Sequence, residues 1–122
     1  MNQWKNLDEA ASYQLLCKTQ KVNLTELMSG DEGRERVRKY QIPMAEGLTY
    51  SYAAKQVDDQ ILKELCSLAD EMQLAGKFEE LYNGAVINTG EKRLVLHHLT
   101  RGQLGNKVYA DGTDKRAFYT EQ

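Results

Sequence analysis

Several patterns that identify a function directly are missing from this sequence. No apolar run approaches the ~20 residues that a membrane-spanning helix needs, and the first residues lack the basic start and apolar stretch of a signal peptide. Neither a G-x-G-x-x-G loop nor a P-loop occurs. We therefore expect a cytoplasmic protein with no membrane partner and no phosphate-binding loop of these two kinds.

Cysteine and proline are scarce, with two Cys and one Pro in 122 residues. Cys17 and Cys66 lie far apart, within helical patterns and without metal-site spacing, so they are predicted to be buried free thiols rather than a disulfide or a zinc site. Pro43 cannot donate a backbone hydrogen bond. A strand that contains it is expected at a sheet edge or to be irregular.

Charge of one sign is not in large excess. Sixteen basic and eighteen acidic residues leave a formal net charge of -2, which disfavours nucleic acid as a partner. The densest basic cluster is Arg34, Arg36, Arg38 and Lys39, and acidic residues are interspersed with it. A solvated helix face is the favoured interpretation, and a phosphate-binding patch is the alternative. The contents of 41% hydrophobic and 28% charged residues suit a thin domain or a piece of a larger one.

Three Asn-x-x-Glu steps, beginning at Asn6, Asn23 and Asn88, have the pattern of a capping box and predict helix starts. The first helix is predicted over residues 7–19. Its expected apolar stripe is Leu7, Ala11, Leu15 and Leu16. The second begins near residue 24, is weakened by glycines at 30 and 33, and resumes over residues 34–39.

Alternating apolar residues between positions 40 and 54 predict two short strands that form a hairpin. Asp58 is expected to cap the clearest amphipathic helix, whose apolar stripe is Ile61, Leu62, Leu65, Leu68, Ala69 and Met72. A shorter helix over residues 75–82 should end at Asn83 and Gly84 in a left-handed cap.

Residues 91–100 are predicted to form a helix with apolar side chains around more than half of its circumference, which indicates burial. Residues 108–110 are predicted to form a short strand that is followed by a turn at Asp111 and Gly112. No completed element is expected beyond Gly112. The predicted fold is α+β, mainly helical with a small β-hairpin.

The chemistry-bearing residues are sparse. His97 and His98, the only histidines, point about 100° apart on a helix and cannot chelate one metal from a common face. His97 is either a general acid or base or, as we favour, a buried histidine bonded to a neighbouring carboxylate or carbonyl. Arg93 and Arg101, with Glu91, could bind a sugar phosphate, but internal ion pairing is favoured. We assign no catalytic, cofactor-binding or metal-binding residue.

The segment from Tyr82 to Arg101 carries a family signature. Residues 82–88 read Tyr-Asn-Gly-Ala-Val-Ile-Asn, residues 89–97 read Thr-Gly-Glu-Lys-Arg-Leu-Val-Leu-His, and Arg101 comes four residues later. These motifs resemble the N-terminal part of the glucose-6-phosphate isomerase family, with its Phe-x-Gly-Glu-x-Ile-Asn and Thr-Glu-x-Arg-x-Val-Leu-His. Residues 49–56, 62–69 and 108–112 resemble it in the same order. Ala85 and His98 depart from the usual pattern.

The resemblance implies a cytoplasmic, usually dimeric enzyme that interconverts glucose 6-phosphate and fructose 6-phosphate in glycolysis and gluconeogenesis, without metal or cofactor. In that family a histidine opens the sugar ring, a glutamate moves the proton through a cis-enediol, and an arginine stabilises its charge. These groups and the phosphate-binding hydroxyls lie C-terminal of the matched segment, in two doubly wound α/β domains of the sugar isomerase type.

Residues 1–122 are thus predicted to be an N-terminal segment of this isomerase that packs against the rest of the polypeptide and is inactive alone. It is expected to expose an apolar patch. The alternative is a stand-alone interaction module derived from the isomerase N-terminus. Whether Arg93, His97 or Arg101 supports the active site from outside it stays open.

Overall fold

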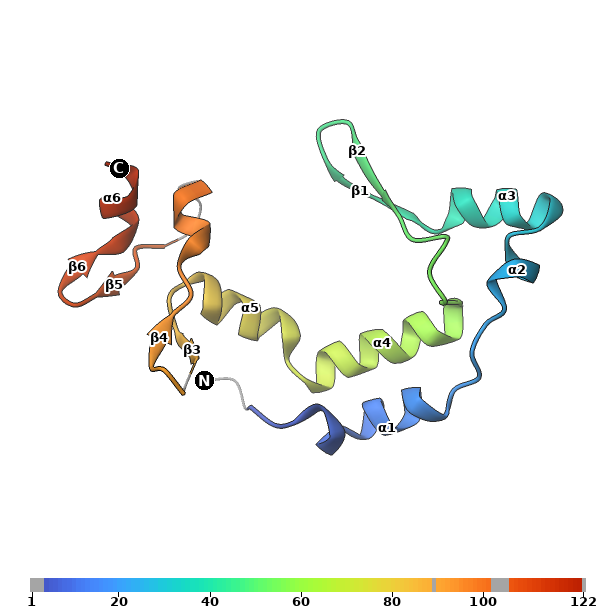
Figure 1. The fold of residues 1–122 in the computed structure, drawn as a ribbon, viewed down its shortest axis with the longest axis horizontal. Coiled ribbons are helices and arrows are strands. Elements are labelled where there is room, and N and C mark those ends of the chain that lie inside the picture. The colour runs from blue at the N-terminus through green and yellow to red at the C-terminus, as the bar shows by residue number, and fades with distance from the viewer. Residues whose placement is uncertain (1–3, 89, 102–105, 122) are drawn as a thin grey trace. The chain divides into compact units, whose positions relative to one another are not determined.

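The computed structural model describes residues 4–88, 90–101 and 106–121 of the chain (Figure 1). The chain divides into two compact units, one formed by Lys5–Glu71 and the other by Met72–Gln122 together with Met1–Trp4. Helices predominate, and each sheet is a two-stranded antiparallel pair, so the predicted mainly helical fold with a small hairpin is confirmed.

The first unit begins with a short 3-10 helix, η1 (Leu7–Glu9), followed by helix α1 (Ala11–Lys18). The capping box predicted at Asn6 is present, because the Asn6 amide donates to Glu9 Oε2 at 3.0 Å. The single helix predicted over residues 7–19 is wrong, because Ala10 between the two elements is extended. The predicted stripe is wrong in part as well, since Leu7 and Leu15 are exposed.

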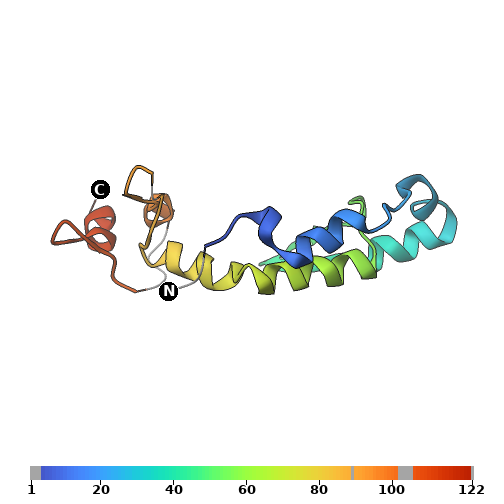
Figure 2. The same cartoon turned by 90° about the horizontal axis from the view of Figure 1, so that it is seen from below.

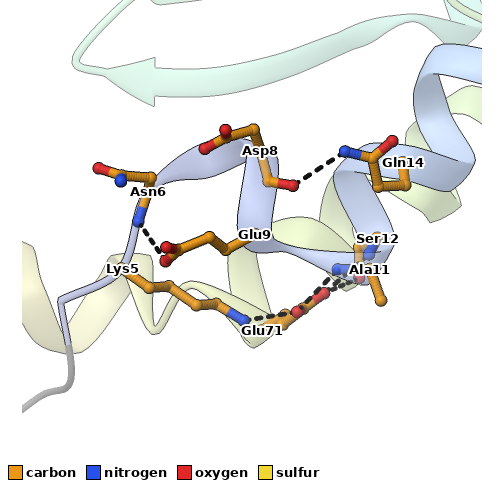
Figure 3. A network of polar contacts seen from close by, with 8 residues as sticks. All are labelled: Lys5, Asn6, Asp8, Glu9, Ala11, Ser12, Gln14 and Glu71. Carbon is orange, nitrogen blue, oxygen red and sulfur yellow. Dashed lines mark hydrogen bonds and ion pairs between the residues drawn. The ribbon is translucent and has the colours of Figure 1, made fainter.

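A carboxylate from a distant helix explains the break at Ala10. Glu71, the last residue of α4 (Asp59–Glu71), accepts hydrogen bonds from the backbone amides of Ala11 at 3.0 Å and Ser12 at 2.8 Å (Figure 3). It also accepts from Lys5 Nζ and from the Ser12 hydroxyl, both at 2.6 Å. These contacts, with the Lys5 ammonium first among them, lower the pKa of Glu71 to about 2. Glu71 therefore caps the start of α1 across the helix pair, which no local pattern reveals.

Helix α1 runs antiparallel along α4, as Figures 1 and 2 show. Asp58 caps α4 as predicted, since its Oδ1 accepts from the Ile61 amide at 2.8 Å. Ile61 is buried as expected. Glu64 on the same helix is buried too, and it is bonded to Thr19 Oγ1 at 2.5 Å and to Gln60 at 2.7 Å. Polar contacts therefore contribute to this helix pair along with apolar ones.

Helix α2 (Leu24–Leu27) starts at Asn23 as predicted, with the Asn23 side chain accepting from the Thr25 amide at 3.1 Å. Helix α3 (Gly30–Lys39) resumes four residues earlier than the predicted position 34. A Cβ at Gly33 would lie 2.2 Å from the Met28 carbonyl oxygen. The glycine that weakened the helix prediction is thus the residue that allows the tight passage from α2 into α3.

The predicted hairpin is confirmed as β1 (Gln41–Ala45) and β2 (Leu48–Ser51), with Ile42 opposite Tyr50. The register shifts between Pro43 and Ala45, which fits the irregularity expected at the proline. Every residue of both strands is exposed.

Arg36 of the basic cluster is buried, so the interpretation of the whole cluster as a solvated face is wrong for this residue. Its guanidinium donates to the carbonyls of Ala53 at 2.8 Å, Lys55 at 3.0 Å and Val57 at 2.6 Å. The other three cations are exposed and pair with Asp31, Glu35 and Asp59. Arg36 thereby holds the segment between the hairpin and α4 against α3.

The second unit begins with α5 (Leu74–Tyr82), and Gly84 has a φ of +84° after it, as the predicted left-handed cap requires. The helix predicted over residues 91–100 is wrong. In its place β3 (Val86–Asn88) pairs with β4 (Arg93–Leu94), and the 3-10 helix η2 (His97–Arg101) comes next. Lys92 adopts a φ of +52°, which a continuous α-helix excludes. Asn88 therefore lies in a strand and starts no helix.

The predicted strand and turn near residue 110 are confirmed as β5 (Tyr109–Ala110), β6 (Thr113–Asp114) and a Gly112 with a φ of +72°. The expectation of no element beyond Gly112 is wrong, because α6 (Lys115–Thr120) lies there. Asp114 caps it by accepting from the amides of Arg116 at 3.1 Å and Ala117 at 3.4 Å.

Both cysteines are free, but Cys17 and Cys66 are exposed, so their predicted burial is wrong. Within the described residues, no helix is long and apolar enough to cross a membrane.

Candidate functional site around Tyr82 and His98

The family signature brings Tyr82 and His98 face to face in the second unit. Their rings stack with centroids 4.3 Å apart and an interplanar angle of 25°. The His98 Nε2 atom also lies 2.9 Å from the Tyr82 carbonyl oxygen, so this nitrogen carries the proton and donates. The role that the sequence suggested for His97, a histidine bonded to a neighbouring carbonyl, thus belongs to His98.

Two fully buried apolar side chains, Leu99 and Val108, form the core of this region. Gly84 packs directly on Val108, and a Cβ at position 84 would lie 2.3 Å from Val108 Cγ1. Arg116 is buried, donates from Nε to the Asn106 carbonyl at 2.6 Å, and places its guanidinium 5.5 Å from the centre of the Tyr82 ring. The signature residues therefore belong to a packed core that joins η2 to α6.

His97 is exposed, so the favoured interpretation of a buried histidine is wrong for this residue. It lines an open hollow of about 470 Å³ with Tyr82, His98, Thr100 and Arg101. Arg101 is exposed as well. Of the candidate residues, the structure therefore brings His97 and Arg101 together. None of the described residues that line this hollow is acidic.

Arg93 lies elsewhere, on strand β4, and lines a different hollow of about 590 Å³. The charged residues in that hollow are Lys92, Arg93, Asp111 and Lys115. Glu91 Oε2 lies 3.8 Å from Arg93 Nη1, and both side chains are exposed. Arg93 and Arg101 therefore line two separate hollows. Their favoured role of ion pairing is present at Arg93, but it is local and anchors no helix.

Among the described residues, no group of three His, Cys, Asp or Glu side chains converges in a way that could hold a metal ion. The histidines of the signature have aromatic, backbone and cationic neighbours. Around Tyr82, the described part of the chain offers ring stacking and a hydrogen bond to His98.

Residue-level interpretation missed Lys115 and Arg116. Both come after Gly112, where no completed element was predicted. Asp114 followed by an uninterrupted run without glycine or proline was the available signal for a capped helix start. The approach of Arg116 to Tyr82 depends on the fold and carried no signal in the sequence.

Comparison with known proteins agrees with the signature. A sequence model described as "Phosphoglucose isomerase" matches residues 51–120. This range is more than half of the chain and includes α4, α5 and the core around Tyr82. The chain belongs to the phosphoglucose isomerase family.

Individual relatives carry a more specific name. The glucose-6-phosphate isomerase of Treponema denticola is 46% identical over 125 residues, covering 98% of this chain and 24% of that protein. The glucose-6-phosphate isomerase of Treponema pallidum is 47% identical, covering 98% of this chain and 23% of that protein. A crystal structure of a glucose-6-phosphate isomerase from Chlamydia trachomatis matches with a TM-score of 0.75 and 29% identity, covering 96% of this chain and 24% of that chain. The chain thus spans about a quarter of the length of these relatives.

Proposed function

We propose that this chain is the N-terminal part of a glucose-6-phosphate isomerase, the cytoplasmic enzyme of glycolysis and gluconeogenesis that interconverts glucose 6-phosphate and fructose 6-phosphate. The observation that carries the proposal is the match of 98% of the chain to 24% of the Treponema denticola isomerase at 46% identity. Such a match along nearly the whole chain is far more specific than any short motif.

The chain's role in that enzyme is to build and hold structure rather than to react with the sugar. Its signature residues support this role, because His98 is bonded to Tyr82, Gly84 packs tightly on Val108, and Leu99 is fully buried. The catalytic groups and the sugar phosphate site belong to the remaining three quarters of the enzyme, in a doubly wound α/β body. The chain alone is inactive, the active enzyme is a homodimer, and no cofactor takes part.

A chimera tests this proposal. Residues 1–122 of this chain replace the matching quarter of the Treponema denticola isomerase, and a coupled assay measures glucose 6-phosphate formation from fructose 6-phosphate. We expect turnover within about tenfold of the parent enzyme. The control is the Treponema denticola enzyme without its matching quarter, which should show no turnover above background.

A soluble, folded chimera without turnover above background would contradict the proposal, provided that the parent enzyme is active in the same assay. Equal turnover by the truncated control would contradict it as well, because the quarter supplied by this chain would then be dispensable.

A further inference from the structure

The β1–β2 hairpin in the first unit has one apolar and one polar face. Ile42 and Tyr50 are directly opposite each other in the register, and beyond the bulge Leu48 lies opposite Ala45. Side chains two apart on a strand share a face, so Leu48 and Tyr50 lie on one side of the hairpin together with Ile42, which is paired with Tyr50. We call this set the apolar hairpin face. The other face carries Gln41, Pro43, Thr49 and Ser51.

The apolar hairpin face is open to solvent. Ile42 is 49% exposed, Leu48 65% and Tyr50 43%. Figure 1 shows the hairpin projecting beyond the end of α3, with its tip away from the helices of its own unit. Large apolar side chains grouped in this way mark a surface that another part of a protein covers.

The base of the hairpin is fixed, in contrast to its tip. Tyr40 is buried, its ring lies 5.3 Å from that of Tyr52, and its hydroxyl donates to Asp59 at 2.8 Å. Burial raises the pKa of Tyr40, while the hydrogen bond from Lys39 lowers the pKa of Asp59. A two-stranded hairpin is marginally stable in water unless it packs on something further. The contacts of Tyr40 therefore anchor the base of the hairpin to the start of α4.

A hollow of about 480 Å³ continues the apolar hairpin face toward α4. It is lined by Ile42, Tyr50, Tyr52, Lys55, Val57 and Leu62. Lys55 is the one charged residue among these six, so the occupant of the hollow is expected to be apolar. We infer that the apolar hairpin face and this hollow form the surface on which the remaining three quarters of the isomerase polypeptide dock.

The size of the surface favours the same polypeptide over a second copy of the chain. Half-exposed side chains of this size offer on the order of 100 Å² each, hence roughly 300 Å² for the three. A stable interface between separate proteins needs about 800 Å² from each partner. A segment of the same chain avoids most of the entropy lost on association, so a smaller surface suffices. The relatives are about four times as long as this chain, which supplies such a segment.

This inference rests on the proposed function, and a labelling experiment tests it separately from activity. In the chimera, Ile42→Cys and Leu48→Cys place a thiol on the apolar hairpin face, and Thr49→Cys places one on the polar face as the matched control. Reaction with a soluble maleimide is measured peptide by peptide by mass spectrometry. We expect the thiols at 42 and 48 to react at least about tenfold more slowly than the thiol at 49, and all three to react alike in denaturant.

Hydroxyl-radical oxidation of Tyr50 in the unsubstituted chimera repeats the measurement without a mutation and should show the same protection. Equal reactivity at positions 42, 48 and 49 in an active chimera would overturn the inference while the proposed function stands. Protection at 42 and 48 that vanishes when the enzyme is diluted to monomers would also overturn it, because the cover would then be a second copy. Protection in an inactive chimera would refute only the proposed function.

Discussion

The two units differ in how well their helix starts could be predicted from the sequence. In Lys5–Glu71 the predicted starts at Asn6, Asn23 and Asp58 are all confirmed, and so is the hairpin. In Met72–Gln122 the pattern at Asn88 has the same spacing as that at Asn6, yet it starts no helix.

The difference lies in the residues around each cap. A capping box lowers the free energy of a helix start by about 1 kcal/mol, which is too little to outweigh the backbone around it. Residues 86–88 include β-branched Val and Ile, Gly90 interrupts the run, and Lys92 turns with a positive φ. A cap pattern is therefore informative only where its neighbours along the chain also favour a helix. Substitutions in each unit can separate the part that depends on local contacts from the part that depends on long-range ones.

The largest expected effect is at Arg36 in the first unit. Arg36→Ala removes three hydrogen bonds to carbonyls, of which that of Lys55 keeps a second donor, the Val57 amide, and we expect a loss of about 3–5 kcal/mol in the free energy of unfolding. Urea denaturation measures the loss, and amide hydrogen exchange of residues 53–57 localises it. Arg34→Ala is the control, because its pair with Asp31 is exposed and should contribute less than about 0.5 kcal/mol. Equal losses in both variants would show that Arg36 is an ordinary surface residue.

Gly84 gives the next largest effect and lies in the second unit. Gly84→Ala combines a positive φ with a clash against Val108, for an expected loss of about 2–4 kcal/mol. Gly112→Ala has a similar φ but nothing within 4 Å of its Cβ, so it should cost only about 1 kcal/mol. Thermal unfolding of the two variants side by side measures the difference. Identical melting temperatures would refute the close packing of Gly84 on Val108.

The adjacent histidines provide a smaller contrast. His98→Ala removes the stack on Tyr82 and one hydrogen bond, so we expect a loss of about 1–2 kcal/mol. His97→Ala, at an exposed position, should change stability by less than about 0.5 kcal/mol. In the chimera, turnover per folded molecule should be unchanged in both variants. A large fall in turnover for His97→Ala at unchanged stability would instead assign it a catalytic role.

The smallest effect is a pH dependence carried by Glu71. Its folded pKa of about 2 lies below its ordinary value of 4.5. The stabilisation is therefore fully present above pH 4.5 and is lost as the pH falls from there toward 2. Glu71→Gln should remove this part of the acid dependence, whereas Glu9→Gln, which touches only the local cap of η1, should keep it. Urea midpoints measured between about pH 2 and 6 provide the test, and parallel curves for Glu71→Gln and the parent would refute it.

Elements with a local cause could be predicted from the sequence. The hairpin was predictable from its alternation, the start of α4 from Asp58, and the end of α5 from Asn83 and Gly84. The break at Ala10 could not be predicted, because its cause is Glu71, sixty residues along the chain from Ala11.

The candidate site shows the same division. The signature identified the family correctly, since it depends on residue types in order. Which histidine contacts Tyr82 depended on η2 being a 3-10 helix rather than part of a longer α-helix, and the guanidinium of Arg116 reaches the ring only through the fold. The assignment of roles to His97, Arg93 and Arg101 therefore needed the structure.

The central claim is that this chain identifies an isomerase while the reaction takes place on groups outside it. The most direct measurement compares the 122-residue chain alone with the chimera in the coupled assay, at equal and high protein concentration. We predict background for the chain and sustained formation of glucose 6-phosphate for the chimera. Turnover by the chain alone, proportional to its concentration and abolished by His97→Ala, would contradict the claim.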